Sequence, residues 1–408
     1  MEKMMNATLF RGMKPLEVSE FLILGIMVIL LPIDWQLVMW MMPLLVLNVV
    51  ARMVVGRRVG NGSLSPLSRW GLWIMVALYL YQVLSLTYTT NLDEGCDMLL
   101  RRLPLLVFPL CFLSVDSGYL TRDRLRTLMW LFTGCMVVKF FVRLAIMLFT
   151  HHKIVFSSTF DPLHHTYMAM YLMMALGFLY SEWHRHRHEM SKALSVIMYL
   201  SVVVVVAYTV MVLSRTGIVG VVVIAFAVIA HQIFVLKEVR RGLCMLFGML
   251  IVGTGVFFLL PESARRMTQT LEEVSSGDTS DARFYIMKSS LRAIGESMPF
   301  GVGIGDKNEA LAAVYEETGD DYANRAQWNS HNIYLDSLLT TGIPGLLLLL
   351  ALLAVPSVEA VRQRDLVLLS FVFTVAFSGL FEALFNRQMG IMYIGLLGVL
   401  LMSAVKEE

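Results

Sequence analysis

The chain has 408 residues, of which 57% are hydrophobic and 16% are charged. A soluble domain carries about 25% charged residues, so this composition excludes an ordinary soluble protein and indicates a polytopic membrane protein. The formal charge of +2 indicates no particular partner, because the placement of charge matters more than its sum in a membrane protein.

Hydropathy predicts an all-α protein, because a membrane-spanning helix needs about 20 mostly apolar residues and twelve stretches approach that rule. We expect nine spans in residues 1–260, a large hydrophilic loop over 261–331, and three spans in 332–408. The first apolar run ends without a small-residue cleavage site, so we expect it to be retained as the first span. The predicted spans begin near Val18, Trp35, Trp70, Leu103, Thr127, Thr166, Ala193, Thr216, Gly242, Asn332, Asp365 and Met389.

The cysteines are scattered along the chain, so they predict neither a disulfide framework nor a metal site. They are Cys96, Cys111, Cys135 and Cys244.

Lys and Arg are distributed unevenly between the two predicted sides of the membrane. If both termini are cytoplasmic, nineteen Lys and Arg fall on the inner side and only five in the short outer loops. Such asymmetry sets orientation, so the loop over 261–331 is expected to face the periplasm.

A few arginines lie on the outer side, where orientation rules disfavour them. Arg101, Arg102 and Arg387 stand at predicted helix ends, where they either reach lipid phosphates or bind a ligand. Arg215 lies in the tight turn LSRTG, and Arg283 opens the hydrophilic segment DARFY. For Arg215 we favour a functional role, because a turn between two apolar helices needs no cation.

Two further cations, Lys139 and Arg143, fall inside the fifth predicted span on one helical face. An ionisable residue at membrane depth is costly and is a functional candidate. Arg143 could instead reach the outer surface, and Lys139 could pair with an acidic residue of another helix.

An amphipathic helix is predicted from Asp281, capped by Ser280 or Asp281 itself and stopped by Pro299. Its apolar stripe consists of Phe284, Met287, Leu291 and Ile294. The next segment, PFGVGIG, has three alternating glycines that could expose backbone N–H groups to a phosphate. We prefer a plain tight turn, because the spacing matches no established nucleotide motif.

The acidic run over Glu316–Asp321 could bind a divalent cation, but a solvated loop is preferred because regular ligand spacing is lacking. His331 stands where the loop re-enters the membrane, beside Asn332 and Tyr334. An imidazole with a pKa near 6.5 suits proton removal at neutral pH. A histidine that only caps a helix or lies at the interface is the alternative.

The predicted spans, the long hydrophilic loop and the motifs around Arg215, Arg283 and His331 together resemble the O-antigen ligase and polymerase family of membrane glycosyltransferases, which share the Wzy_C region. The resemblance rests on LSRTGIVG, on DARFYIMKSSLRAIGESMPFGVGIG, on SHNIYLDSLLTTGIPGLLLLL, and on the final spans with Glu382 and Arg387. Jointly these stretches cover about half of the chain. DPLHHTYMAMYL, which contains His165 and Tyr167, is similar to a sequence seen in some members.

The resemblance implies a GT-C-like fold and a metal-independent, inverting glycosyltransferase without a cofactor. Family members transfer a glycan from undecaprenyl diphosphate to a sugar hydroxyl, at the periplasmic face of the bacterial inner membrane. Ligases use lipid A–core as the acceptor, and no nucleic acid takes part. By resemblance, His331 is the base, while Arg215 and Arg283 hold the diphosphate. We add Arg101, Arg102 and Arg387 as weaker members of that cluster, with His165, Tyr167, Asn332, Tyr334 and Glu382 as accessory candidates.

Three alternatives follow from the same sequence. A repeat-unit polymerase would use the same donor and the same outer site. A transporter or flippase could also have twelve spans, but it would usually show internal repeats, and we find no second loop like the one over 261–331. A non-catalytic scaffold would not require Arg215 in a turn or His331 at the re-entry point.

Overall fold

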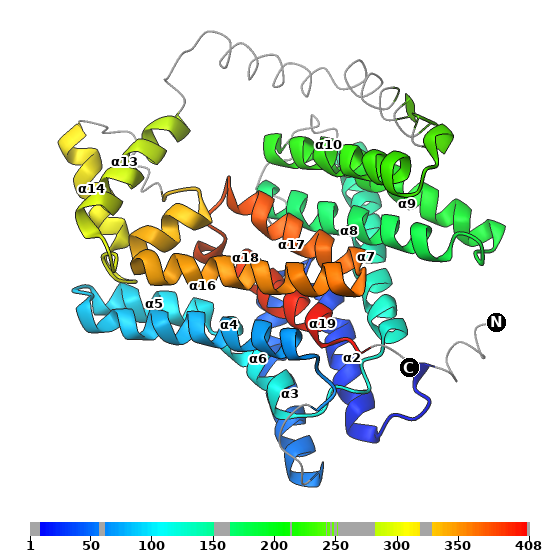
Figure 1. The fold of residues 1–408 in the computed structure, drawn as a ribbon, viewed down its shortest axis with the longest axis horizontal. Helices are drawn as coiled ribbons and strands as arrows, with labels where there is room; N and C mark the ends of the chain where they lie inside the picture. The colour runs from blue at the N-terminus through cyan, green and yellow to red at the C-terminus, as the bar shows by residue number, and fades with distance from the viewer. Residues whose placement is uncertain are drawn as a thin grey trace. The chain divides into compact units, whose positions relative to one another are not determined.

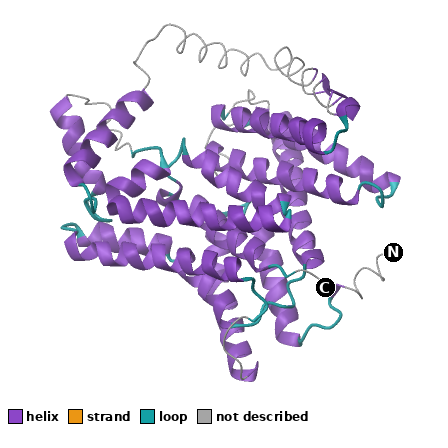
Figure 2. Cartoon of the chain, in the orientation of Figure 1, coloured by secondary structure: helices purple, strands orange, loops and turns teal. Residues whose placement is uncertain are grey.

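The computed structural model describes residues 9–56, 62–150, 164–212, 214–241, 243–244, 247–248, 251, 282–318 and 329–405. Every regular element in those ranges is a helix (Figure 2). This confirms the predicted all-α class.

The helices follow the predicted hydropathy pattern closely. A helix begins within five residues of eleven predicted starts, while the segment after Gly242 lies largely outside the described residues. The longer helices are α2 (Pro15–Leu30), α3 (Trp35–Gly56), α4 (Pro66–Ser85), α5 (Leu92–Arg102), α6 (Pro104–Ser114), α7 (Arg122–Thr150), α8 (His165–His186), α9 (Lys192–Met211), α10 (Arg215–Ala230), α13 (Ala282–Ser297), α14 (Lys307–Thr318), α16 (Ile333–Gln363) and α17 (Leu366–Gly379). The last predicted span consists of α18 (Gln388–Met392), the π-helix η4 (Tyr393–Leu397) and α19 (Gly398–Ser403).

Six helices among the described residues are long and apolar enough to cross a membrane. They are Trp35–Gly56, Pro66–Tyr88, Arg122–Ile146, Lys192–Met211, Thr216–Val235 and Ile333–Gln363. Three shorter apolar helices accompany them, at Pro104–Ser114, Leu366–Gly379 and Gln388–Ser403. The count of twelve spans therefore stays a prediction.

The chain divides into two compact units. Unit one contains Met1–Cys135 and Ile286–Glu408, and unit two contains Met136–Tyr285. In unit one, α16 packs against α4 and α17 (Figure 1). In unit two, α8, α9 and α10 pack on one another.

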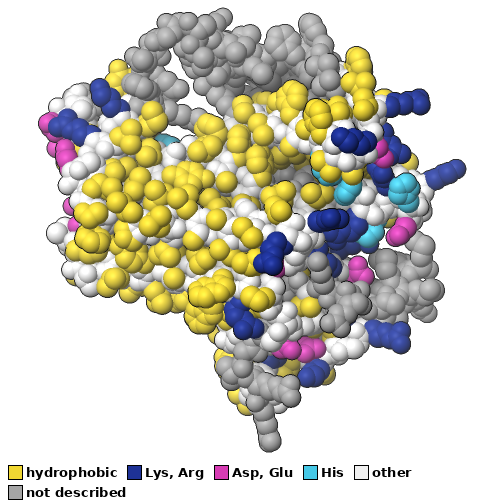
Figure 3. Space-filling model, viewed as in Figure 1, with side chains coloured by type: hydrophobic (Ala, Val, Ile, Leu, Met, Phe, Trp, Pro, Cys, Tyr) yellow, Lys and Arg dark blue, Asp and Glu magenta, His cyan; other side chains and the backbone are white. Residues whose placement is uncertain are grey.

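Much of the outer surface of unit one is apolar, as a membrane requires. Figure 3 shows hydrophobic side chains covering the visible face over α4 and α16. Trp70 of α4 is 65% exposed and Leu347 of α16 is 59% exposed. Such a continuous apolar surface is rare on soluble monomers and fits contact with lipid.

A break in α16 at Gly342 shapes the part of unit one that carries the candidate site. Gly342 has φ +66°, outside helical geometry. In an uninterrupted helix, the Thr340 carbonyl would accept from residue 344, but Pro344 has no N–H. Backbone N–H and C=O groups at the break in α16 therefore lack their helical partners. In the apolar surroundings of this helix, each unpaired group costs several kcal/mol.

The glycine-rich loop after α13 supplies these partners. Val302 N–H donates to the Leu339 carbonyl at 2.8 Å, and Gly303 N–H donates to the Thr340 carbonyl at 2.9 Å. In return, Ile343 N–H donates to the Pro299 carbonyl at 2.9 Å. The loop thus replaces the missing helical bonds.

Close backbone approach explains two of the glycines. A Cβ on Gly301, which has φ +77°, would lie 2.7 Å from the Leu339 carbonyl oxygen, and one on Gly342 would lie 2.1 Å from the Pro299 oxygen. The N–H of Gly301 donates to the Ser297 carbonyl at 2.9 Å. Because the N–H groups of residues 301–303 all have backbone partners, the preferred interpretation of a tight turn fits better than a phosphate cradle.

The end of the glycine-rich loop is attached to the turn before α5. The Asp306 carboxylate accepts from the N–H groups of Thr90 and Asn91, each at 2.8 Å. The Tyr88 hydroxyl donates to the Phe300 carbonyl at 3.1 Å. The loop therefore joins α5 to the first half of α16, and α14 starts directly after it.

Candidate active site

The first turn of α16 is held by Asn332, which is its N-cap. The Asn332 Oδ1 accepts from the N–H groups of Tyr334 at 2.9 Å and Leu335 at 3.0 Å. Such a cap satisfies donors that a helix start leaves unpaired. Asn332 Nδ2 also donates to the Leu380 carbonyl at 3.1 Å, which attaches the helix start to the segment after α17.

His331 immediately precedes this cap. Its backbone has φ +44°, a left-handed conformation that is uncommon for a residue with a side chain. Its N–H donates to Asn329 Oδ1 at 2.9 Å. The imidazole is neither buried nor fully free, since 33% of the side chain is exposed. This partial exposure leaves part of the ring accessible to solvent.

Glu382 lies beside this imidazole. Its Oε1 is 3.7 Å from His331 Nδ1, and only 7% of its side chain is exposed. A carboxylate near Nδ1 favours the tautomer that leaves Nε2 as the proton acceptor, and it stabilises the imidazolium that forms. The structure thus brings together a candidate base and an accessory candidate from segments far apart in the sequence.

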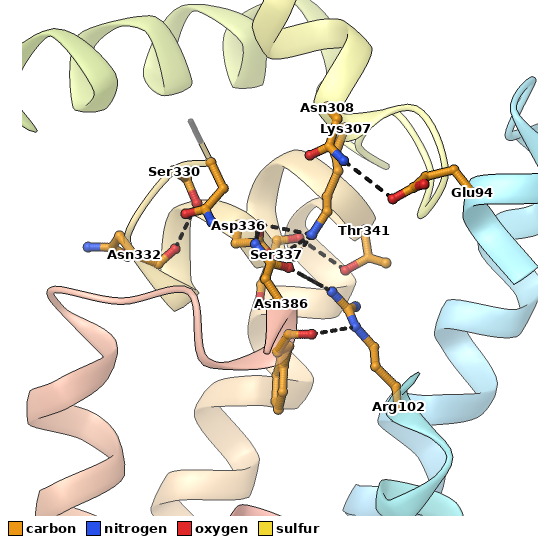
Figure 4. Close-up of polar contacts among 12 residues, drawn as sticks. Glu94, Arg102, Lys307, Asn308, Ser330, Asn332, Asp336, Ser337, Thr341 and Asn386 are labelled. Atoms are coloured by element: carbon orange, nitrogen blue, oxygen red, sulfur yellow. Dashed lines mark hydrogen bonds and ion pairs between the residues drawn. The ribbon is translucent and has the colours of Figure 1, made fainter. Parts of the chain in front are cut away.

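Behind the first turn of α16 lies a buried cluster of charges, shown in Figure 4. Arg102, Lys307 and Asp336 are 2%, 1% and 2% exposed. Lys307 Nζ lies 3.2 Å from Asp336 Oδ1, and Arg102 Nη2 lies 3.7 Å from Asp336 Oδ2. Two cations therefore share one carboxylate.

Asn386 completes the buried cluster. Its Oδ1 accepts from Lys307 Nζ, and also from Arg102 Nη2 at 3.3 Å, while its Nδ2 donates to Asp336 Oδ1 at 3.0 Å. Arg102 Nε donates to the Phe385 carbonyl at 3.1 Å. Burial lowers the pKa of Lys307 to about 8, with Arg102 acting in the same direction and Asp336 opposing it. Charges buried this deeply persist only when they are paired and hydrogen-bonded.

The arginines that the sequence proposed for unit one lie in different surroundings. The Arg102 guanidinium is occupied by the buried cluster. Arg101, whose side chain is 48% exposed, pairs with Asp97 at 3.6 Å. Arg387 is exposed and is the N-cap residue of α18. A role of these three arginines in donor binding stays a prediction.

Other predicted site residues belong to unit two. Ser214 caps α10 by accepting from Gly217 N–H at 3.2 Å, which makes Arg215 the first helical residue. Arg283 is the second residue of α13, and the side chains of both arginines lie outside the described part. His165 is exposed at the start of α8, and Tyr167 is 1% exposed. The assembly of these residues with His331 into one site is a prediction.

The acidic run is described only as far as Thr318, at the end of α14. Glu317 there pairs with Arg292 of α13. Within the described ranges, no group of three or more His, Cys, Asp and Glu side chains is placed to hold a metal ion. The predicted caps of α13, Ser280 and Asp281, fall outside those ranges.

Sequence reasoning missed Lys307 and Asn386. Lys307 occurs in a hydrophilic loop, where a lysine is expected to face water. The available signal was Asp336, an acidic residue one turn inside an apolar helix, which required a buried cationic partner. Hydropathy alone could not show that Lys307 and Arg102 supply it.

The apolar helices indicate a multi-spanning membrane protein. The family model Wzy_C, described as O-antigen ligase, matches residues 200–350. This match supports the O-antigen ligase family, as the motifs predicted, and suggests a ligase or polymerase type of glycosyltransferase function. No curated protein matches the chain. The matched range contains Arg215, Arg283, Lys307, His331 and Asp336.

Proposed function

We propose that this protein is an O-antigen ligase-like glycosyltransferase. It moves a glycan from undecaprenyl diphosphate to a sugar hydroxyl of lipid A–core at the periplasmic face of the inner membrane. The observation that carries the proposal is the partly exposed His331 imidazole, 3.7 Å from the Glu382 carboxylate at a capped helix start. The match to the O-antigen ligase family supports the same chemistry.

In this proposal His331 is the general base. Its Nε2 takes the proton of the acceptor hydroxyl as that oxygen bonds to the anomeric carbon, while the bond from that carbon to the diphosphate oxygen breaks. Glu382 stabilises the resulting imidazolium through its position near Nδ1. A single displacement of this kind inverts the configuration of the anomeric carbon.

The leaving diphosphate requires compensation for its growing negative charge. We assign this role to Arg215 and Arg283, because guanidinium groups bind phosphate oxygens bidentately and stay charged. Such pre-arranged donors stabilise charge that develops in the transition state, without a metal ion. Arg101, Arg102 and Arg387 are proposed as weaker members of the same cluster, and Asn332 and Tyr334 as groups that hold the helix start.

The proposed topology has twelve spans, both termini in the cytoplasm and the loop over 261–331 in the periplasm. It rests on the nineteen-to-five distribution of Lys and Arg. Reporter fusions after Gly277 and after Arg187 are expected to report periplasm and cytoplasm respectively. The reverse pattern would place His331 on the wrong side for a lipid-linked donor.

Deletion of the gene tests the proposed function in the cell, with surface polysaccharide separated on a gel. Lipid A–core without attached polymer is the expected result for a ligase. Core that carries a single repeat unit would instead identify a polymerase with the same donor. Unchanged surface polysaccharide would contradict both functions.

A further inference from the structure

Lys307 is deeply buried, although its position in a hydrophilic loop predicts an exposed side chain. It starts α14 in the hydrophilic loop over 261–331, yet only 1% of its surface is exposed. Lysines are almost never buried to this extent unless they are paired. The only carboxylate that its ammonium contacts in the described structure, Asp336, is also approached by Arg102.

The buried cluster therefore has a formal charge of +1 when Lys307 is protonated. Apolar residues of similar volume would often be more stable than a buried group of charges. Breaking such a group by removing one partner, in contrast, is strongly destabilising. Burying these charges costs stability, and removing one of them costs more. Such a cluster is therefore suited to holding the segments that carry it in one arrangement.

The contacts of Lys307 reach the two segments on which the proposed chemistry depends. Asp336 lies in the first turn of α16, which follows His331 and the Asn332 cap. Asn386 is adjacent to Arg387 and lies in the segment that begins with Glu382. One ammonium thus contacts both segments, while its own backbone belongs to α14, next to the glycine-rich loop (Figure 4).

We propose that Lys307 is a positioning residue, whose buried ammonium fixes the His331 helix start against the Glu382–Arg387 segment by donating to both Asp336 and Asn386. This inference rests on the proposed transferase function for its consequence in catalysis. The bridge itself is a statement about geometry, and it can be tested without a substrate. Arg102 supports the same two segments from α5 through Asp336 and Asn386.

Protonation of Lys307 gives the bridge a pH dependence. The charged groups that act on Lys307 are Arg102 and Glu94 of α5 and Asp336 of α16. The folded pKa of about 8 lies below the ordinary 10.5, so the ammonium loses its proton above about pH 8. The contribution of this group to the stability of the bridged arrangement therefore rises between about pH 8 and 10.5, because the closed form no longer holds a buried charge while the open form is still protonated.

The test uses full-length protein carrying Lys307→Met, which keeps the length of the side chain and removes its charge. Lys288→Met, at an exposed lysine of α13, is the matched control. Hydrogen–deuterium exchange is measured over residues 333–340 and 382–388, with α17 as an internal reference. We expect protection of both segments to fall by about tenfold or more in Lys307→Met, but not in the control.

The pH dependence of exchange provides a second test, and its wild-type arm does not depend on whether Lys307→Met folds. Protection factors of the two segments, corrected for intrinsic exchange, are expected to rise between pH 7 and pH 9 in wild type but not in Lys307→Met, while α17 stays constant in both. Unchanged protection in wild type and in Lys307→Met would overturn the inference.

Glycan transfer separates this inference from the proposed function. For Lys307→Met we expect a lower turnover number with a nearly unchanged KM for the lipid-linked donor, because alignment is lost and binding is not. Full turnover in Lys307→Met beside an active wild type would overturn the inference and leave the proposed function in place. Absence of transfer by wild type, with lowered protection in Lys307→Met, would overturn the proposed function and leave the bridge.

Discussion

Replacement of His331 by alanine is expected to lower glycan transfer by about 100- to 10,000-fold, which is the usual contribution of a positioned general base. The protein should still insert and bind its lipid-linked donor, because one third of the His331 side chain is exposed and its packing contribution is small. Transfer from purified lipid-linked glycan measures the rate. Binding of the donor to the same preparation measures the retained site.

His165→Ala is the matched control for this prediction. His165 is also an exposed histidine before an apolar helix, but its ring lies 3.9 Å from that of His164 and the structure places it in unit two. We expect His165→Ala to retain most of the transfer. Full transfer by His331→Ala together with loss in His165→Ala would move the base to His165.

The arginines assigned to the diphosphate give the second large effect. Arg215→Ala and Arg283→Ala are each expected to lower transfer by about 100- to 1,000-fold, the loss seen when one donor to a developing negative charge is removed. Lysine at either position should restore only part of the activity, because a point charge does not reproduce the guanidinium fork. Transfer is compared at equal amounts of membrane-inserted protein.

Arg292→Ala controls for the general loss of a cation near Arg283. Arg292 lies on the same helix, α13, and its exposed guanidinium pairs with Glu296 and Glu317. Exposed ion pairs of this kind contribute little to stability. Normal transfer in both Arg215→Ala and Arg283→Ala would remove these arginines from the proposed mechanism.

Helices and their starts were accessible from the sequence, because hydropathy and capping residues act locally. Pro299 ends the region of α13 as predicted, and Asn332 occupies the position before α16. The break in α16 was not predicted. Hydropathy predicts one continuous apolar helix over residues 333–363. The only sign of the break is Pro344, which has no N–H to donate to the Thr340 carbonyl.

The candidate site was predictable in its residue types and only partly in its arrangement. His331 and Glu382 were both named from the sequence, but their proximity depends on how α16 packs against α17. Lys307 was missed because its partners come from other parts of the chain. A cation in a hydrophilic loop resembles a solvated one until the fold encloses it.

Transfer by the purified wild-type protein tests the central claim most directly. The protein is mixed with radiolabelled undecaprenyl-diphosphate-linked glycan and lipid A–core, and the products are separated on a gel. We expect the label to move to lipid A–core, with release of undecaprenyl diphosphate, and to stay on the donor when His331→Ala replaces the wild type. Label that remains on the donor in the presence of folded wild-type protein would contradict the proposed ligase.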